Sequence, residues 1–286
     1  MRLGVGSYAF RWAVGTTDFR PTRPMTCADM VDEAARLGCG LLQISDNAEL
    51  DGADDDDLTA LREHALRRGI ALQVGATGSS VEVLMRYLDV AVATGADLVR
   101  VVLDDNTGCD AATQDSTAIE WLSTVATHYE RAGVTLGVEN HFRVTSPRLE
   151  VILDRVGSRA VGAVLDVANS IVCGEWPEYT VARLARHTKG VHLKDYDLVP
   201  ELDGVGARVI GTPLGRGRTD VAAVLDAVSP VDDGRLGIVL ELWCPRATTE
   251  SKTLATETAW REDSMAEARR QLCRPGPPGE AKRVAH

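Results

Sequence analysis

The sequence lacks the patterns from which disulfide frameworks, structural zinc sites and membrane spans are built. Its six cysteines are scattered and form no Cys-x-x-Cys pair, which is typical of reduced thiols in the cytosol. No apolar run approaches the ~20 residues that a membrane-spanning helix needs. The apolar part of the N-terminus is too short for a signal peptide and reads as a first strand. We therefore expect a soluble cytoplasmic protein without a membrane partner.

Positive charge is also scarce. The chain carries 31 Lys and Arg against 42 Asp and Glu, which gives a formal net charge of -11. Because such a surface repels the phosphates of a nucleic acid, the charge argues against a nucleic-acid partner. What the chain does have is length and apolar content: 286 residues at 44% hydrophobic are enough to bury one large core. We expect a single domain.

Short apolar runs alternate with helix-like segments along most of the chain. The expected strands are residues 2–8, 40–45, 70–75, 97–103, 134–139, 161–166, 190–194 and 236–241. Eight strand–helix units predict an α/β fold with a parallel sheet. The first strand is not followed by a Gly-x-Gly-x-x-Gly turn, which favours a (β/α)8 TIM barrel over an open doubly wound sheet. We assign residues 1–273 to the barrel, expect a loop over 196–219, and expect the Pro/Gly-rich, charged tail 274–286 to be disordered.

Four of the expected strands end in a side chain that can bind a divalent cation: Glu139, Asp166, His192 and Glu241. Active sites of such barrels form at the C-terminal ends of the strands, so these side chains are expected to meet. Each one alone is explained by a loop salt bridge or a buried histidine, but their joint occurrence favours a metal site. Three carboxylates and one imidazole suit Mn²⁺ first, with Mg²⁺ or Co²⁺ as alternatives, better than a thiolate-seeking metal.

The stretches around these residues resemble a known family. Gly-Val-Glu-Asn-His (137–141), Val-Leu-Asp-Val-Ala-Asn-Ser (164–170) with Cys-Gly-Glu (173–175), Val-His-Leu-Lys-Asp (191–195) and Leu-Glu-Leu-Trp (240–243) are similar to motifs of the xylose-isomerase-like barrels, in particular the sugar phosphate isomerases/epimerases. The resemblance extends to about Leu272 and implies the same four metal ligands. It also implies a homo-oligomer, since family members often form dimers or tetramers. One position departs: ketose 3-epimerases of the family have a histidine three residues after the aspartate, where this chain has Asn169.

The resemblance and the ligand set together imply chemistry on a small sugar or sugar acid. The first hypothesis is an isomerase or epimerase that acts through a metal-bound enediolate, with Glu139 and Glu241 removing and returning a proton on opposite faces of the substrate. The alternative is a metal-dependent decarboxylase, a lyase of a 3-oxo sugar acid such as an oxo-isoapionate-type substrate, because loss of CO2 passes through a similar enolate. A DNA-repair endonuclease is disfavoured by the charge and by only six histidines. A non-catalytic sugar-binding barrel is disfavoured because all four ligands are present.

Five further residues are candidate substrate contacts: His141, Asn169, Glu175, Lys194 and Arg208. Lys194 shares a face with His192, since residues two apart on a strand point the same way. Lys194 and Arg208, the latter on the expected loop, would suit an anionic substrate or else lie at the surface. His141 would contact substrate or brace the neighbouring glutamate. Glu175 would bind a substrate hydroxyl or form a loop salt bridge.

Overall fold

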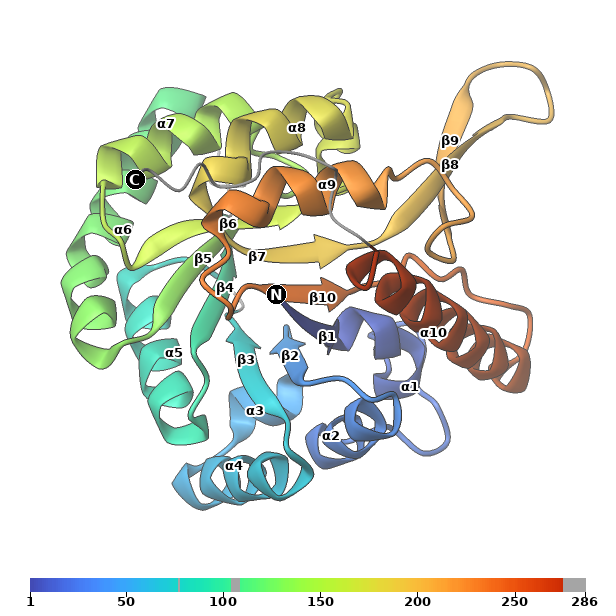
Figure 1. Ribbon diagram of the computed structural model, residues 1–286, viewed down its shortest axis with the longest axis horizontal. Coiled ribbons are helices and arrows are strands. Elements are labelled where there is room, and N and C mark those ends of the chain that lie inside the picture. The colour runs from blue at the N-terminus through green and yellow to red at the C-terminus, as the bar shows by residue number, and fades with distance from the viewer. Residues whose placement is uncertain (77, 104–108, 275–286) are drawn as a thin grey trace, which may run out of the picture.

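The computed structural model describes residues 1–76, 78–103 and 109–274. Eight parallel strands close into a barrel in the order β1-β10-β7-β6-β5-β4-β3-β2 (Figure 1), so the predicted (β/α)8 TIM barrel is confirmed. The barrel strands are β1 (Arg2–Gly6), β2 (Leu41–Ser45), β3 (Ala71–Gly75), β4 (Leu98–Val102), β5 (Thr135–Glu139), β6 (Val161–Asp166), β7 (Thr188–Leu193) and β10 (Gly237–Leu240).

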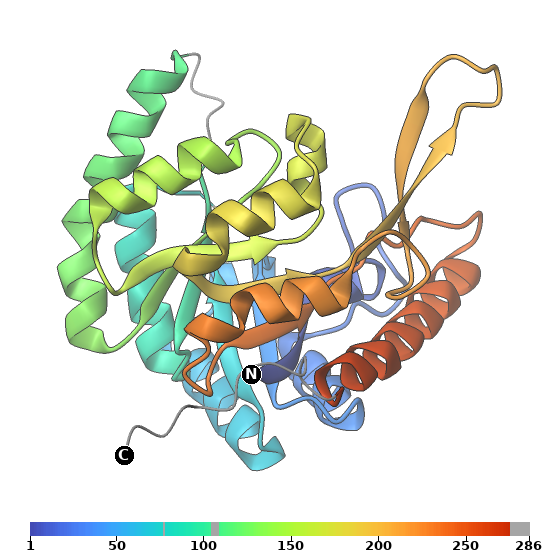
Figure 2. The same cartoon turned by 45° about the horizontal axis from the view of Figure 1, so that its top comes forward.

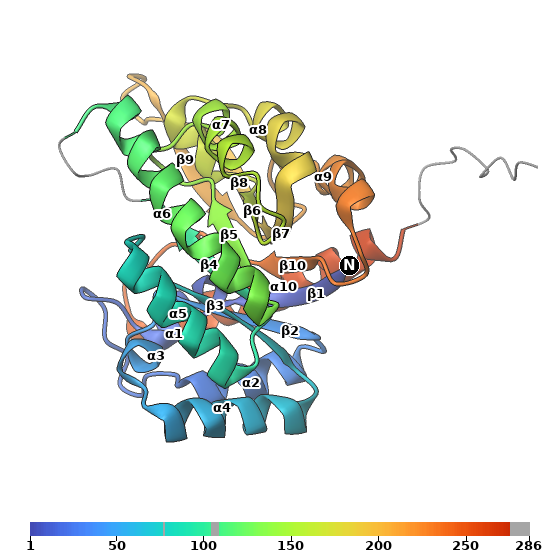
Figure 3. The same cartoon turned by 90° about the vertical axis from the view of Figure 1, so that its left-hand side faces the viewer.

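The helices surround the barrel, as Figure 3 shows from the side. They are α1 (Arg11–Val14), α2 (Cys27–Arg36), α3 (Ala48–Gly52), α4 (Asp55–Arg68), α5 (Val81–Thr94), α6 (Ala111–Ala132), α7 (Ser146–Val156), α8 (Pro177–Leu184), α9 (Val221–Val228) and α10 (Glu250–Leu272). Within the described ranges, none of them combines the length and the apolar character required to cross a bilayer.

Side chains at the helix ends explain where several helices begin and stop. Thr26 before α2 and Asp54 before α4 each accept a hydrogen bond from the backbone N–H three residues on, and Asp29 and Asp57 return the bond to the cap residue. The acidic first turn of α4 also suits the positive end of the helix dipole. Gly95 ends α5 at a φ of +71°, a backbone conformation that glycine adopts without steric cost.

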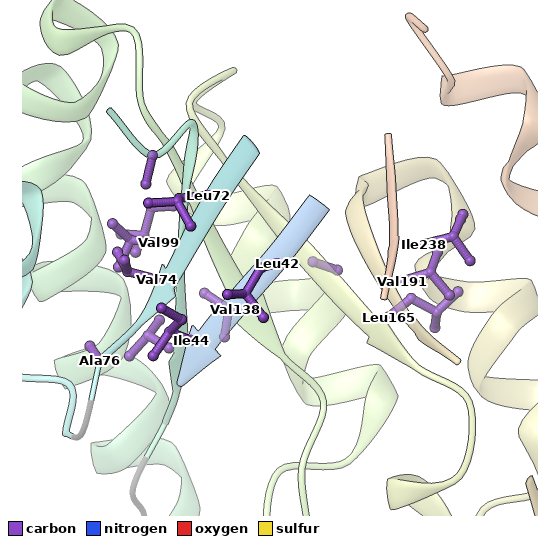
Figure 4. Close-up of a cluster of buried hydrophobic side chains, with 14 of the residues drawn as sticks. Leu42, Ile44, Leu72, Val74, Ala76, Val99, Val138, Leu165, Val191 and Ile238 are labelled. Carbon is purple, nitrogen blue, oxygen red and sulfur yellow. The ribbon is translucent and has the colours of Figure 1, made fainter. Parts of the chain in front are cut away.

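Successive side chains of each barrel strand point alternately outward, toward the helices, and inward, into the barrel. Leu42 and Ile44 of β2 and Leu72 and Val74 of β3 lie in the apolar layer between the barrel and its helices (Figure 4). The residues between them point to the other face, into the barrel. There the register pairs Gln43 with Gln73, so the barrel interior carries polar groups at a level where the outer layer is apolar.

The segment 196–219, expected to be a loop, contains a β-hairpin instead. Its strands β8 (Asp195–Pro200) and β9 (Ala207–Thr212) pair antiparallel, and the hairpin projects from the barrel (Figures 1 and 2). The base of the hairpin is anchored by Asp195, whose carboxylate accepts hydrogen bonds from the backbone N–H groups of Gly215, Gly217 and Thr219 at 2.8–2.9 Å. The expectation of an irregular loop was wrong because the many glycines outweighed the β-branched residues between them. Beyond Arg274, the tail expected to be disordered lies outside the described residues.

Candidate metal centre

The four predicted ligands converge at the C-terminal end of the barrel. Glu139 and Asp166 are the last residues of β5 and β6, and His192 is the fifth residue of β7. Glu241 directly follows β10 and donates its N–H to the carbonyl of Leu193 at 3.0 Å. Each of the four residues is at most 3% exposed, and one ligand atom from each lies within 4.8 Å of the others. A buried Glu/Asp/His/Glu cluster of this kind indicates a divalent-metal site.

The imidazole of His192 presents one nitrogen to the three carboxylates. Its Nδ1 lies 3.3 Å from Oε1 of Glu241, 3.4 Å from Oε1 of Glu139 and 3.8 Å from Oδ2 of Asp166. Nδ1 has no hydrogen-bond partner in the part of the chain that the structure describes, whereas Nε2 lies 2.7 Å from Oε1 of Gln43. A buried nitrogen left open beside three carboxylate oxygens fits the coordination of a cation.

Hydrogen bonds with the backbone orient the carboxylate of Asp166 so that one oxygen points toward the cluster. Its Oδ1 accepts hydrogen bonds from the N–H groups of Ala168 at 2.8 Å and Asn169 at 2.9 Å. The neighbouring amide of Asn140 binds both the N–H and the carbonyl of Asp166 at 2.8 Å. These bonds leave Oδ2 facing the cluster. Burial raises the pKa of Asp166, although the ammonium of Lys194 opposes that shift.

Glu139 is held from two sides. Nε of Arg100 donates to Oε2 of Glu139, and Nδ2 of Asn169 donates to its Oε1 at 2.7 Å. Burial disfavours the charged form, but the guanidinium of Arg100 and the ring of His192 hold the pKa of Glu139 well below its ordinary value. Glu139 is therefore a fixed anion within the cluster.

The same guanidinium reaches Asp46 at the end of β2. Nη1 of Arg100 lies 2.9 Å from Oδ2 of Asp46, which also accepts a hydrogen bond from the hydroxyl of Tyr8 at 3.1 Å. Asp46 has a φ of +49°, in the left-handed region that aspartate enters more readily than most residues with a side chain. This backbone conformation follows directly after the last residue of β2, at the turn where the carboxylate meets Arg100.

Lys194 extends its ammonium group into the cluster. Nζ lies 2.6 Å from Oδ2 of Asp166 and 2.9 Å from Oε2 of Glu241, and it donates to Oδ1 of Asn169 at 3.5 Å. It also lies 5.3 Å from the ring centroid of Trp243, a cation–π distance. Burial disfavours the charged form, but the surrounding carboxylates raise the pKa of Lys194 above its ordinary value, which favours the ammonium form.

Comparison with known proteins agrees with this geometry. A sequence profile described as xylose isomerase-like TIM barrel matches residues 31–266. The chain belongs to the xylose isomerase-like TIM barrel family. Among curated relatives, the 3-oxo-isoapionate decarboxylase of Pectobacterium atrosepticum is 28% identical over 265 residues, which cover 93% of this chain and 94% of that protein. With its buried ligand cluster, this xylose isomerase-like barrel is a metal-dependent enzyme by family and by site.

Solved structures of similar fold superpose over nearly the whole chain. A D-psicose 3-epimerase from Clostridium cellulolyticum H10 with D-tagatose has a TM-score of 0.70 at 15% identity, over 95% of this chain and 99% of that one. A xylose isomerase-like TIM barrel protein from Mycobacterium smegmatis in complex with magnesium has a TM-score of 0.68 at 15% identity, over 93% of this chain and 97% of that one. At such identities the likeness shows a shared fold.

Of the five candidate substrate contacts in this xylose isomerase-like barrel, two lie in the cluster and three do not. Lys194 and Asn169 touch the predicted ligands, as described above. The half-buried ring of His141 stacks on Phe142 at a centroid distance of 4.0 Å, and burial lowers its pKa.

The other two candidates are engaged away from the cluster. Glu175 accepts hydrogen bonds from the backbone N–H of Ser146 at 2.9 and 3.2 Å, at the start of α7. Arg208 lies exposed on β9 and pairs with Glu201 at 2.6 Å. Its guanidinium is thus on the projecting hairpin, paired within that hairpin.

The polar residues of the site that were not assigned a role from the sequence include three inside barrel strands: Arg100, Gln43 and Gln73. Arg100 stands between Val99 and Val101 in a strand that otherwise reads as fully apolar. A charged side chain in such a strand, at 3% exposure, needs buried partners, and it finds them in two carboxylates. A polar residue inside an apolar barrel strand is the signal that would have marked all three.

Proposed function

We propose that this protein is a metal-dependent decarboxylase of a 3-oxo sugar acid. The observation that carries the proposal is the hold on Glu139, whose two oxygens accept hydrogen bonds from Arg100 and Asn169. An epimerase that uses Glu139 needs it to take up or give back a carbon-bound proton. Decarboxylation needs no such base, because the electron pair comes from the broken carbon–carbon bond. The full-length similarity to a 3-oxo-isoapionate decarboxylase supports the same choice.

The four ligand residues Glu139, Asp166, His192 and Glu241 would hold the cation. When bound, a divalent cation would polarise the 3-oxo carbonyl and stabilise negative charge that develops on its oxygen. The ligand set fits Mn²⁺, Mg²⁺ or Co²⁺, which accept carboxylate and imidazole together. The chain's own residues supply orientation and charge around that oxygen.

Lys194 is the residue best placed to bind the substrate carboxylate. Its ammonium is buried beside two predicted ligands, so it reaches substrate atoms that lie next to the ligand cluster. It also carries positive charge into a site rich in carboxylates, which favours an anionic substrate. In the reaction, the bond between the carboxylate carbon and the neighbouring carbon breaks and its electrons pass toward the carbonyl. CO2 leaves, and one proton from solvent water is added at the vacated carbon.

A second candidate function is isomerisation or epimerisation of a small sugar. It is favoured by the placement of Glu139 at the end of β5 and of Glu241 after β10, because these strands are separated by β6 and β7 in the barrel. Carboxylates on two sides of the cluster could serve opposite faces of a substrate carbon. Among the described residues, the Glu241 carboxylate lies 2.9 Å from Nζ of Lys194 and 3.3 Å from Nδ1 of His192, whereas that of Glu139 accepts hydrogen bonds from both Arg100 and Asn169.

The two functions differ in whether the substrate loses a carbon atom: a decarboxylase releases one as CO2, whereas an isomerase retains all of them. The enzyme is incubated with Mg²⁺ in D2O and with 3-oxo-isoapionate or a panel of ketoses, and the products are followed by NMR. We expect release of CO2 and deuterium at the vacated carbon. Deuterium beside a carbonyl with every carbon retained would establish the isomerase instead. Glu139→Gln should remove either activity, whereas Glu63→Gln, on the exposed face of α4, should leave it unchanged.

A further inference from the structure

A chain of hydrogen bonds crosses the interior of the barrel and ends on His192. It begins with Arg2 at the start of β1, which donates to Oδ2 of Asp97 just before β4. Nε2 of Gln73 donates to Oδ1 of Asp97 at 3.2 Å, and Nε2 of Gln43 donates to Oε1 of Gln73 at 3.1 Å. Oε1 of Gln43 then lies 2.7 Å from Nε2 of His192. The chain runs from the N-terminal end of the strands to the ligand cluster at the opposite end.

The direction of every bond follows from the first. A carboxylate paired with a guanidinium only accepts hydrogen bonds, so Gln73 must turn its NH2 group toward Asp97. Its carbonyl oxygen then faces Gln43, which must turn its own NH2 group toward Gln73. The oxygen of Gln43, which also accepts a hydrogen bond from the hydroxyl of Ser45 at 3.3 Å, then faces His192, so the imidazole must carry a hydrogen on Nε2. In the neutral ring, Nδ1 then keeps its lone pair, on the side where the three carboxylates lie.

The barrel has room for this chain because of a glycine. Gln43 and Gln73 are 1% and 2% exposed, and each amide needs its partners, since a buried unpaired amide is costly. A Cβ at Gly237 of β10 would come within 3.2 Å of Nε2 of Gln73 and 2.8 Å of the Leu41 side chain. Glycine at that position leaves space for a polar side chain where barrels of this kind pack aliphatic layers.

We propose that Asp97, Gln73 and Gln43 are positioning residues that fix the tautomer of His192 from the far end of the barrel. Were the amides turned the other way, Gln43 would donate to Nε2, and the hydrogen of the neutral ring would sit on Nδ1. A protonated Nδ1 has no lone pair for a cation. The inference rests on the metal site of the proposed function, but the state of the ring can be measured without metal.

Three variants at the outer end test the direction of the chain without touching the cluster. In Asp97→Asn, Arg2 takes the one amide oxygen, the new NH2 group faces Gln73, and the chain reverses. We expect the Kd for Mn²⁺ to rise about tenfold, the lower end of what loss of an outer partner of a metal ligand costs. Arg2→Met removes the same ion pair but keeps the carboxylate, so the Kd should stay within about twofold of wild type.

The double variant Arg2→Met/Asp97→Asn separates direction from simple damage. Without the guanidinium, the amide oxygen is free to face Gln73, and the Kd should return to within about threefold of wild type. Equal Kd values for Asp97→Asn and Arg2→Met, or a double variant as weak as Asp97→Asn, would overturn the proposal. Thermal unfolding of all three shows that they are folded.

A spectroscopic measurement reads the ring directly. In metal-free protein with ¹⁵N-labelled histidine, at a pH where the ring is neutral, a two-bond ¹H–¹⁵N spectrum shows which nitrogen carries hydrogen. His192, assigned with a His192→Gln variant, should carry it on Nε2 in wild type and on Nδ1 in Asp97→Asn. Hydrogen on Nδ1 in the wild type refutes the proposal whether or not Mn²⁺ binds. Failure of wild type to bind Mn²⁺, with Nε2 protonated, refutes the metal site and leaves the hydrogen-bond chain standing.

Discussion

Nζ of Lys194 lies 2.6 Å from Oδ2 of Asp166, the oxygen that backbone hydrogen bonds leave facing the ligand cluster. Lys194 thus supplies positive charge to the acidic cluster, beside the guanidinium of Arg100 at Glu139. A carboxylate that is predicted to bind the cation is at the same time paired with this ammonium. Cation binding and charge balance in this site are therefore coupled through Lys194.

Replacement of Lys194 by methionine should expose that coupling. Without metal, the substitution leaves buried carboxylates uncompensated, and the free energy of unfolding should fall by about 3–5 kcal/mol. Mn²⁺ should then stabilise Lys194→Met by more than it stabilises wild type. Thermal unfolding with EDTA and with Mn²⁺ measures both effects. The exposed Lys252→Met on α10 is the control, and an equal metal-free loss in the two variants would contradict the expected role.

Asp166→Asn should separate the fold from the metal site. The asparagine oxygen can still accept the hydrogen bonds from Ala168 and Asn169, so the loop geometry is kept. Its NH2 group then faces the cluster and repels a cation. Mn²⁺ at 100 times its Kd should stabilise wild type by about 2.7 kcal/mol and the variant not at all. An equal rise in Tm for both proteins would falsify the assignment of this ligand.

Arg100→Lys tests the two-sided contact of the guanidinium. One ammonium cannot reproduce the planar fork that reaches both Glu139 and Asp46, so one carboxylate is left without its partner. The free energy of unfolding should fall by about 1–3 kcal/mol, as measured by urea titration. In the control Arg36→Lys, at an exposed arginine that pairs with Glu33, the change should stay within about 0.5 kcal/mol. Equal changes in the two variants would show that the buried guanidinium of Arg100 contributes no more to stability than an exposed one.

A pH dependence is expected away from the metal centre, at Glu257 of α10. Its carboxylate accepts the backbone N–H groups of Trp12 and Ala13 at 2.6 and 3.0 Å, yet burial raises its pKa to about 7. The folded state therefore binds a proton that the unfolded state releases at a lower pH. Glu257 thus contributes most to stability below pH 4.5, the ordinary value, and that contribution is lost as the pH rises toward 7.

The shift corresponds to a loss of about 3 kcal/mol across this window. Urea denaturation of wild type and Glu257→Gln at pH 5 and pH 8 measures it. The wild type should lose more stability between the two pH values than the variant, because glutamine does not titrate. Parallel losses would mean that Glu257 ionises normally in the folded protein.

The barrel and the ligand residues could be predicted because their signals are local. Each strand is a short apolar run, and Glu139, Asp166 and Glu241 stand where such a run ends. Closure of a parallel barrel brings strand ends together by geometry alone. The prediction of four converging side chains therefore needed no knowledge of the contacts between them.

The contacts that orient those side chains could not be predicted in this way. Gln43 and His192 are 149 positions apart, and which residues meet across the barrel depends on register and stagger. The same holds for Arg100, whose partners lie at the end of β5 and directly after β2. Arg208 was expected near the site because its glycine-rich segment predicted a loop. The segment forms a hairpin instead, and Arg208 lies on that hairpin, away from the cluster.

The barrel closes by pairing of β1 with β10, so it cannot close until the last strand has been synthesised. Residues 2–5 pair with 237–240, so the outer edge of the first strand stays open until nearly the whole chain has been translated. At about 5–20 residues per second, that interval is roughly ten to fifty seconds. An unpaired strand edge is a template for wrong association, so an incomplete chain of this protein exposes such an edge until its last strand emerges. Glu241 emerges with that strand, and a prematurely terminated chain would be without a ligand as well as without a closed sheet.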